Sequence, residues 1–546
     1  MGKPVTFMQI KNRRYFRMAA LSLCFALMAF HAAFAEPGDS LESAFAKAQR
    51  EDKIVLLSLS TSWCHWCQAM DELTYADPGV SKLIDDSYVR VRVDQNARPD
   101  VASRYRDFEL PFMVILNSRG EEIVRKQGFL GPRALKSLLE AVVDDPSPGP
   151  SAAREEKIAF PDRPGLTSAV RSELQTRFEA RHDASDKGWT FGTKLFDKDA
   201  IEFGISLAAA GDKTQAARTR AALNSTRQLL DPVWGGVFQS RLVPERGPGD
   251  SKAVRYVRLQ IGGRFDEGGD NWNDPHFEKP LGVQAQALRM FSRGFSQWRA
   301  PEDLEAARNV RGYVQRVLTD ADGAFYTGQS SGVGVAGGEG VYFATDRKRR
   351  EAFATPAIDR SLYPRENGWM IAALCAFHAA AADDSALREA ERAARWMIDN
   401  RGMMSGGFSR GDGNEAGFYL GDTLAMGEAF LALHDATGQR EWLQRAEAAA
   451  QFIQAHFLTA PGPGFVTATS PTGFAVAQRP DPVENAELVR FIGQLAERTS
   501  GSYSNALSSA MRYLSAEQSA AAVSPALALL ADVQFGKSGA RAGAKP

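Results

Sequence analysis

The chain has 546 residues, of which 44% are hydrophobic, 24% charged and 10% aromatic. This ordinary globular mixture excludes a largely disordered protein, and the length favours two domains over a single core. Lys and Arg number 65 and Asp and Glu 66, so the formal charge of −1 provides no basic excess for binding nucleic acid. Four cysteines are too few for a disulfide-rich scaffold. Beyond the N-terminus no apolar run is long enough to span a membrane.

Residues 1–35 have the pattern of a signal peptide. A basic segment, Lys11–Arg17, precedes the apolar run Met18–Phe34, and Ala33-Phe34-Ala35 has the small-x-small pattern after which signal peptidases cut. We therefore expect an exported protein, located in the periplasm, with a mature chain that begins at Glu36. A buried N-terminal helix and a retained membrane anchor are the alternatives.

The route of export stays open between two pathways. Arg13-Arg14 with Phe16 resembles a twin-arginine signal, which would mean export after folding. Asn12 and Arg17 depart from the usual twin-arginine pattern.

Helices and strands are expected to alternate from about Leu41 to Asp144. The expected strands are Ile54–Ser60, which is apolar throughout, Tyr88–Asp94, which alternates in polarity, and the pair Phe112–Asn117 and Glu122–Lys126 around a turn. Helices are expected over Leu41–Arg50, from near Cys64, after Asp77-Pro78, and over Pro132–Val143. This order predicts an α/β thioredoxin-like domain over residues 36–144.

A proline-rich segment, Asp145–Pro150, ends this pattern, and residues 145–163 are expected to be a linker. From 164 to 535 strand patterns almost vanish and Ala-rich amphipathic helices dominate, and residues 536–546 are expected to form a flexible tail.

Turns with glycine and an aromatic residue recur where helices are expected to end. They are Gly235-Gly236-Val237-Phe238, Gly323-Ala324-Phe325-Tyr326, Gly406-Gly407-Phe408 and Gly462-Pro463-Gly464-Phe465. Paired helices joined by such turns predict an all-α (α/α)6 toroid, a closed ring of helical hairpins, with a generic helical array as the alternative.

The segment Trp63-Cys64-His65-Trp66-Cys67 follows the first expected strand and opens a helix. Because the N–H groups at a helix N-terminus stabilise a thiolate, Cys64 is the expected attacking thiol and Cys67 the resolving thiol. A structural disulfide is the alternative. A zinc site would need a second pair of ligands and no other cysteine pair exists, so we expect no metal, and we expect no cofactor.

Other residues are expected to support this dithiol. Pro111 opens the third expected strand, where thioredoxin folds place a cis-proline against the dithiol, and a trans proline that opens an edge strand is the alternative. Protonated His65 would stabilise the Cys64 thiolate, although a solvated imidazole is an equal alternative. Trp63 and Trp66 flank the cysteines. Ser58 stands six residues before Cys64, where thioredoxins carry a buried acid that helps proton transfer.

Taken together, these motifs resemble the spermatogenesis-associated, YyaL-like family. The resemblance rests on Cys64–Cys67 with Met70 and on Val93–Asp100 in the first part, and on Asp274–Lys279 and Asn367–Leu374 in the second. It implies an N-terminal thioredoxin-like domain and a C-terminal six-hairpin, glycosidase-like domain, and it brings no settled reaction. The chain departs from the family at Gly282-Val283-Gln284 and Gln329-Ser330-Ser331, where the family carries other residues, including aspartates.

A second candidate site lies in the helical part. Rings of this kind hold sugar hydrolases, which need two carboxylates, and sugar epimerases. Trp272, His276 and Glu278 are the candidate substrate-binding residues, at the start of an expected helix whose first turn suits Pro275. The dipole of that helix would keep Glu278 ionised, which favours binding over hydrolysis. The alternative is a solvated loop, and Cys375 is expected to be core.

We consider three functions. The preferred one is an exported thiol–disulfide oxidoreductase that uses the Cys-His-Trp-Cys site, with a helical toroid that binds a substrate or partner. Its partners would be protein thiols or disulfides or a redox partner, with a carbohydrate as a further possible ligand, and neither nucleic acid nor a membrane span is expected. The alternatives are a carbohydrate-binding or carbohydrate-active protein with an accessory thioredoxin-like domain, and a non-catalytic scaffold.

Overall fold

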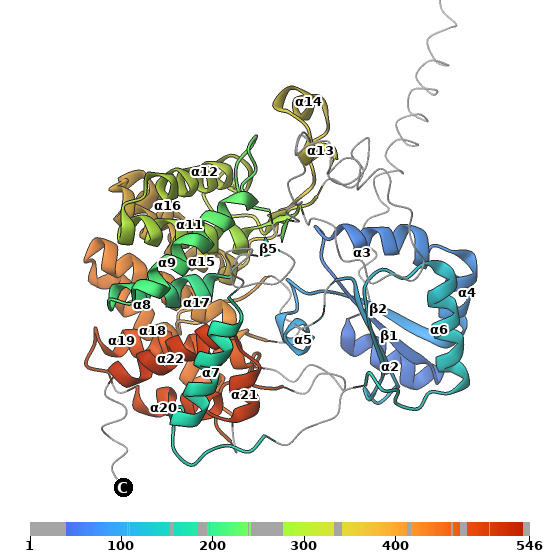
Figure 1. The fold of residues 1–546 in the computed structure, drawn as a ribbon. Helices are drawn as coiled ribbons and strands as arrows, with labels where there is room; N and C mark the ends of the chain where they lie inside the picture. The colour runs from blue at the N-terminus through green and yellow to red at the C-terminus, as the bar shows by residue number, and fades with distance from the viewer. Residues whose placement is uncertain are drawn as a thin grey trace, which may run out of the picture.

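The computed structural model describes residues 40–105, 108, 110–152, 158–182, 194–195, 197–238, 240–241, 277–331, 341–411, 417–459, 462–469, 478–501 and 503–538. The expected signal peptide, residues 1–35, lies outside these residues. Figure 1 shows two parts: a sheet with its helices, coloured blue to cyan, beside a ring of helices coloured green to red.

The first part is built on a four-stranded sheet in the order β2-β1-β3-β4. The central strand β1 (Ile54–Ser60) runs parallel to β2 (Tyr88–Asp94) and antiparallel to β3 (Phe112–Leu116), which pairs with β4 (Glu122–Gln127). Parallel pairing of β1 with β2 requires a crossover, and the helices after the cysteines provide it. The predicted thioredoxin-like α/β fold is confirmed.

Helices cover both faces of this sheet. On one face α2 (Leu41–Glu51) and α5 (Pro99–Arg104) pack on the side chains of alternate strand residues. The other face is covered by η1 (Met70–Tyr75), α4 (Pro78–Ser87) and α6 (Pro132–Asp144). Strand residues alternate between these two cores because successive side chains of a strand point to opposite faces.

Most of these elements begin where the sequence predicts. The Asp77 carboxylate accepts hydrogen bonds from the N–H groups of Gly79 (2.9 Å) and Val80 (3.1 Å), which caps α4 in front of Pro78. The short helix α3 (His65–Ala69) starts directly after Cys64 and continues into the π-helix η1. Helix α5 was not expected, because its six residues are too few to show a helical period.

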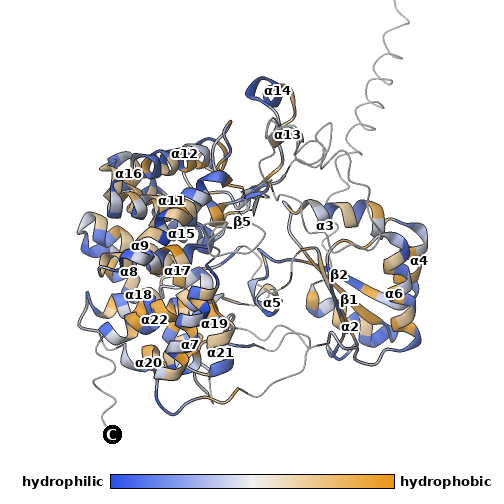
Figure 2. Ribbon diagram, viewed as in Figure 1, coloured by the Kyte–Doolittle hydropathy of each residue, from blue (hydrophilic) through white to orange (hydrophobic). Residues whose placement is uncertain are grey.

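The second part is a closed ring of inner helices. They are α8 (Lys198–Ala209), α11 (Leu281–Trp298), α15 (Pro364–Ala381), α17 (Leu420–Thr437), α19 (Pro482–Ala496) and α22 (Pro525–Lys537). Each packs against the next in this order, and α22 packs against α8, which closes the ring. Figure 2 shows α17 and α22 as largely hydrophobic, as expected for helices enclosed on most sides.

Each inner helix carries one outer helix. The outer helices, in the same order, are α9 (Lys213–Thr226), α12 (Pro301–Val317), α16 (Asp384–Arg401), α18 (Arg440–His456), α20 (Ser504–Leu514) and α7 (Ser168–Ala180). The last pair consists of α22, near the C-terminal end of this part, and α7, at its N-terminal end. The Arg171 guanidinium of α7 binds the Asp532 carboxylate of α22 at 2.8 Å. The predicted (α/α)6 toroid is confirmed.

The glycine–aromatic turns close the hairpins in a common way. Each forms an isolated antiparallel bridge with a residue one or two positions beyond the preceding helix: Leu230 with Val237, Thr319 with Phe325, Gly402 with Phe408, and Leu458 with Phe465. Gly406 has a φ of 95°, and a Cβ there would lie 2.5 Å from the Ala448 carbonyl oxygen, so the turn requires glycine.

Several short elements of the second part are not predicted from the sequence. A three-stranded sheet consists of β7 (Lys279–Pro280), β8 (Gly328–Gln329) and β9 (Ile358–Asp359), and β5 (Lys194–Leu195) pairs with β6 (Ser240–Arg241). The remaining elements are η2 (Arg227–Leu229), α13 (Val341–Ala344), α14 (Arg347–Ala352) and α21 (Glu517–Ala521). Helix α22 extends to Lys537, two residues beyond the expected boundary at 535. Within the described ranges, no helix combines the length and the apolar character that crossing a membrane requires.

Candidate functional site

Cys64 and Cys67 are joined by a disulfide, with their Cα atoms 5.4 Å apart. Cys64 is the N-cap of α3, and the N–H of Cys67 donates a hydrogen bond to the Cys64 Sγ at 3.2 Å. This contact would stabilise a thiolate on Cys64 in the reduced form. Both residues are largely buried, and Cys64 keeps the larger exposed fraction, 5% against 2% for Cys67.

Apolar side chains enclose the disulfide. Trp63, Trp66 and Leu110 pack with the two cysteines in one cluster. The peptide bond between Leu110 and Pro111 is cis, as predicted. The Pro111 carbonyl accepts a hydrogen bond of 2.8 Å from the N–H of Gly128, which ties the start of β3 to the end of β4. His65 is the first residue of α3, and its side chain lies outside the described part of the structure.

Two hydroxyl groups occupy the region where thioredoxins carry a buried acid. The Ser58 Oγ lies 3.0 Å from the Tyr75 Oη, and both residues are buried. The Arg90 guanidinium stacks 3.5 Å from the centre of the Tyr75 ring. Burial raises the pKa of Tyr75, so the phenol stays neutral and Ser58 and Tyr75 form an uncharged hydrogen-bonded pair.

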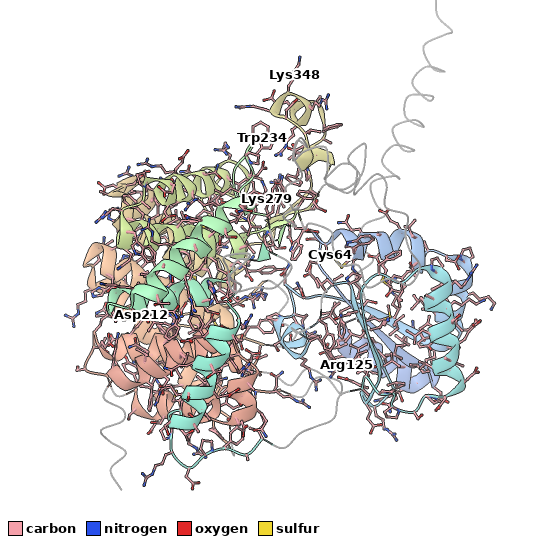
Figure 3. All side chains as sticks on the ribbon, viewed as in Figure 1. Cys64, Arg125, Asp212, Trp234, Lys279 and Lys348 are labelled. Atoms are coloured by element: carbon pink, nitrogen blue, oxygen red, sulfur yellow. A yellow bond between two sulfur atoms is a disulfide. The ribbon has the colours of Figure 1, made fainter. Side chains whose placement is uncertain are left out.

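The loop that carries the disulfide lies against the ring. The Ser62 hydroxyl donates a 2.6 Å hydrogen bond to the Asp359 carboxylate of β9. From the ring, the buried Arg410 donates to the carbonyl of Asn96, and the carboxylates of Asp422 (2.6 Å) and Glu366 (3.4 Å) hold its guanidinium. Figure 3 shows Cys64 on the side of the thioredoxin-like part that faces the ring.

Asp94, at the end of β2, is a titratable group of this interface. Burial raises its pKa to about 6, and the nearby Asp359 carboxylate of the ring acts in the same direction. Backbone N–H groups and Arg410 oppose the shift but do not cancel it. Asp94 therefore gains a proton at a pH at which a solvated aspartate would be ionised.

A cavity of about 430 Å³ lies between the two parts. The thioredoxin-like part contributes the segment after β2, and the inner helices of the ring contribute the rest. The lining residues are Gln95, Asn96, Pro99, Ala102, Ser103, Lys198, Gln286, Arg365, Trp369, Gly421, Leu424, Ala425, Glu428, Val483, Glu484 and Glu487. The site is not predictable from the sequence alone, although two of the motifs that carry the family resemblance, Val93–Asp100 and Asn367–Leu374, supply residues to it.

The substrate-binding residues predicted in the ring are only partly described. Trp272 and His276 lie outside the described residues. Glu278 is buried and does not line the cavity. The prediction that it opens a helix is wrong: β7 follows it, and α11 begins only at Leu281. The cause is pairing of Lys279 with Gln329 of β8, which holds this segment extended.

Next to Glu278, a buried charge cluster surrounds Lys279. Its Nζ donates to the Asp231 carboxylate (2.7 Å) and the Gly235 carbonyl (2.8 Å), and Arg350 binds the same Asp231 oxygen at 2.7 Å. Burial lowers the pKa of Lys279 to about 8. Elsewhere in the ring, Cys375 is buried as expected, and burial raises the pKa of its thiol to about 12.

Both parts of the chain are similar to known proteins. Residues 39–117 match the family Thioredox_DsbH, described as a protein of unknown function, DUF255. Over 348 residues the chain is 22% identical to Spermatogenesis-associated protein 20 of Mus musculus, which covers 59% of this chain and 42% of that protein. Over 318 residues it is 23% identical to Uncharacterized protein B0495.5 of Caenorhabditis elegans, covering 53% of this chain and 40% of that protein. The chain thus spans about two-fifths of the length of these curated relatives.

Solved structures resemble each part separately. Cellobiose 2-epimerase from Bacillus thermoamylovorans B4167 aligns with a TM-score of 0.45 at 10% identity, over 64% of this chain and 87% of that chain. A thioredoxin from Thermus thermophilus aligns with a TM-score of 0.18 at 28% identity, over 19% of this chain and 84% of that chain. The family match and the curated relatives confirm the resemblance to the spermatogenesis-associated proteins that the motifs indicate.

Proposed function

We propose that the protein is a thiol–disulfide oxidoreductase whose reacting groups are Cys64 and Cys67. The observation that carries the proposal is the disulfide at the N-terminus of α3, with the Cys67 N–H directed at the Cys64 sulfur. A sulfur at a helix N-terminus is a good attacking thiolate, and a second sulfur one turn further resolves the mixed disulfide.

The reaction is a pair of thiol–disulfide exchanges. The Cys64 thiolate attacks one sulfur of a substrate disulfide, and the other substrate sulfur leaves as a thiolate and takes up a proton. The Cys67 thiolate then attacks the Cys64 Sγ and releases the second substrate thiol. Two electrons have passed to the substrate, and the protein holds the disulfide. A dithiol partner that runs the same steps in reverse restores the reduced form.

We also propose that this reaction takes place outside the cytoplasm. The support is the signal pattern in residues 1–35, and disulfides persist in oxidising compartments. The expected product of cleavage begins at Glu36. N-terminal sequencing of the mature protein from a cell fractionation checks this, and a mature chain that retains residues 1–35 contradicts it.

Trapping of mixed disulfides tests the redox proposal. Cys67→Ser is expected to hold substrates on Cys64, because the resolving thiol is gone, and mass spectrometry of the non-reduced complexes identifies them. Cys64→Ser should abolish both trapping and the reduction of insulin by the full chain. Cys375→Ser is the matched control and should behave as wild type, since Cys375 is buried in the ring. Exchange by Cys64→Ser at the wild-type rate, or none by the wild type, overturns the proposal.

The carbohydrate alternative uses a different part of the chain. The observation that favours it is the cavity between the two parts, which neither Cys64 nor Cys67 lines. A carbohydrate function is therefore compatible with the redox proposal.

A further inference from the structure

The cavity between the two parts has the size of a small-molecule site. Its volume of about 430 Å³ lies within the range of ligand pockets, roughly 300 to 1,000 Å³. One wall is formed by inner helices of the ring, and the roof is the segment Gln95–Ser103 of the thioredoxin-like part. Both parts are therefore needed to complete it.

Both cations of the lining are paired with carboxylates. Lys198 binds the carboxylates of Asp199 (2.7 Å) and Glu487 (3.2 Å), and Arg365 binds Glu366 at 2.7 Å. Because both lining cations already have carboxylate partners, an anionic ligand such as a phosphate ester would find poor compensation. The lining therefore disfavours a negatively charged ligand.

The uncharged part of the lining provides hydrogen-bonding groups and an aromatic surface. Gln95, Asn96, Ser103 and Gln286 contribute amide and hydroxyl groups. The Asn96 Nδ2 is buried and has no hydrogen-bond partner among the described residues, so a ligand or ordered water is needed to satisfy it. Trp369 is only partly buried and adds a large apolar surface beside these groups.

Three carboxyl groups complete the lining from neighbouring inner helices. Glu428 belongs to α17, Glu484 and Glu487 belong to α19, and α17 packs on α19. Burial raises the pKa of Glu428 to about 7, and the charge of Glu487 adds to the shift, whereas Arg289, Arg490 and Lys198 oppose it. Below this pH Glu428 can donate a hydrogen bond that an ionised carboxylate cannot.

We propose that this cavity is a composite binding site for a neutral mono- or disaccharide, held between Trp369, Glu428 and Glu487 of the ring and the Gln95–Ser103 roof of the thioredoxin-like part. Sugar hydroxyl groups bond to the amides and carboxyls, and an apolar face of the sugar packs on the indole. The site does not depend on the redox proposal, since neither reacting cysteine lines it.

Titration calorimetry of the full chain tests the proposal with glucose, galactose, maltose and lactose as probes. Glucose 6-phosphate and glucosamine, the charged analogues of glucose, serve as controls. At least one neutral sugar is expected to bind with a Kd in the millimolar range or tighter. The charged analogues are expected to bind at least about tenfold more weakly. No binding by any of the four, or tighter binding of glucose 6-phosphate than of glucose, overturns the proposal.

Variants identify the site. Trp369→Ala is expected to weaken binding at least about tenfold, because truncating a central aromatic contact usually has a large effect. Trp396→Ala on the outer helix α16 is the matched control and should bind as wild type.

Since Trp369→Ala could disturb folding, Glu428→Gln gives a second readout. Wild-type affinity should fall as the pH rises through about 7, where Glu428 loses its proton, and Glu428→Gln should not show this fall. Unchanged affinity in Trp369→Ala, or the same pH profile in both proteins, places the site elsewhere. Cys64→Ser should bind sugar as wild type, which separates this test from that of the redox proposal.

Discussion

Lys279 and Arg350 share one buried carboxylate, that of Asp231, and all three side chains are fully buried. The rings of Phe238, Tyr313 and Phe343 surround the Lys279 ammonium at 4.4 to 5.0 Å. The cluster therefore has two cations and one anion. Burial lowers the pKa of Lys279 and the charge of Arg350 adds to this shift, while the two cations hold the pKa of Asp231 below its usual value.

The excess of cations predicts unequal effects of substitution. Asp231→Asn leaves two buried cations without their counter-ion and should cost about 3–5 kcal/mol of stability. Lys279→Met keeps Asp231 paired with Arg350 and leaves only the Gly235 carbonyl without its donor, so about 1–3 kcal/mol is expected. Urea unfolding of both variants measures the difference, and a larger loss in Lys279→Met contradicts the assignment.

The same cluster predicts a pH dependence. Between about pH 8 and pH 10.5 the unfolded chain still holds the Lys279 proton that the folded chain has released. Stability of the wild type should therefore rise with pH in this window relative to Lys279→Met.

Single residues differ in how far the sequence reveals them. Cys64 and Cys67 are predictable because a strand followed by two cysteines at this spacing is a local pattern. Lys279 and Asp231 are 48 residues apart, and Arg350 is 119 residues from Asp231. No local pattern marks such a cluster, because its members come from three segments that meet only in the folded chain.

At the scale of elements, three of the glycine–aromatic turns are held by the next inner helix along the chain. The Asn367 side chain accepts from the Phe325 N–H (2.8 Å) and donates to the Phe325 carbonyl (3.0 Å). Asn485 binds both backbone groups of Phe465 in the same way, and Gln284 those of Val237. Each of the three is the fourth residue of its inner helix. This arrangement joins the end of one hairpin to the start of the next.

Removal of such a clamp should destabilise the ring. Asn367→Leu keeps the size of the side chain but leaves the buried N–H and carbonyl of Phe325 without partners, which should cost about 2–5 kcal/mol. Asn400→Leu on the exposed side of α16 is the control and should change stability by less than about 0.5 kcal/mol. Thermal unfolding monitored by circular dichroism compares them, and equal midpoints would mean that Asn367 does not hold the turn.

The predicted helices repeat their apolar residues over several turns, and the elements that the sequence does not predict are too short to show any such repeat. Helices such as α16 and α18 show their apolar face over many residues. Strands β7, β8 and β9 have two residues each, so they exist only through pairing between distant segments. For the same reason Glu278 was assigned to a helix, since the pairing that extends its segment is not visible locally.

At the scale of the whole molecule, polar contacts join the two parts. Arg410 reaches the Asn96 carbonyl, Ser62 reaches Asp359, and the carboxyl groups of Asp94 and Asp359 interact across the boundary. The sequence predicts both folds but not this interface, because a linker pattern carries no information about docking. The interface determines both the surroundings of the disulfide loop and the roof of the cavity.

This interface should loosen as the pH rises. In the docked form Asp94 holds its proton up to about pH 6, whereas a solvated aspartate loses it near pH 4. The docked form therefore binds more protons between these values, so docking weakens as the pH rises from about 4 to about 6 and does not change further with this group above about 6. Small-angle scattering of the full chain should give a larger radius of gyration at pH 8 than at pH 5.

Asp94→Asn should stay compact at both values, because it removes the charge that faces Asp359. Asp85→Asn, an exposed carboxyl on α4, is the control and should respond to pH as wild type does. If Asp94→Asn expands between pH 5 and pH 8 as much as this control, Asp94 does not govern docking.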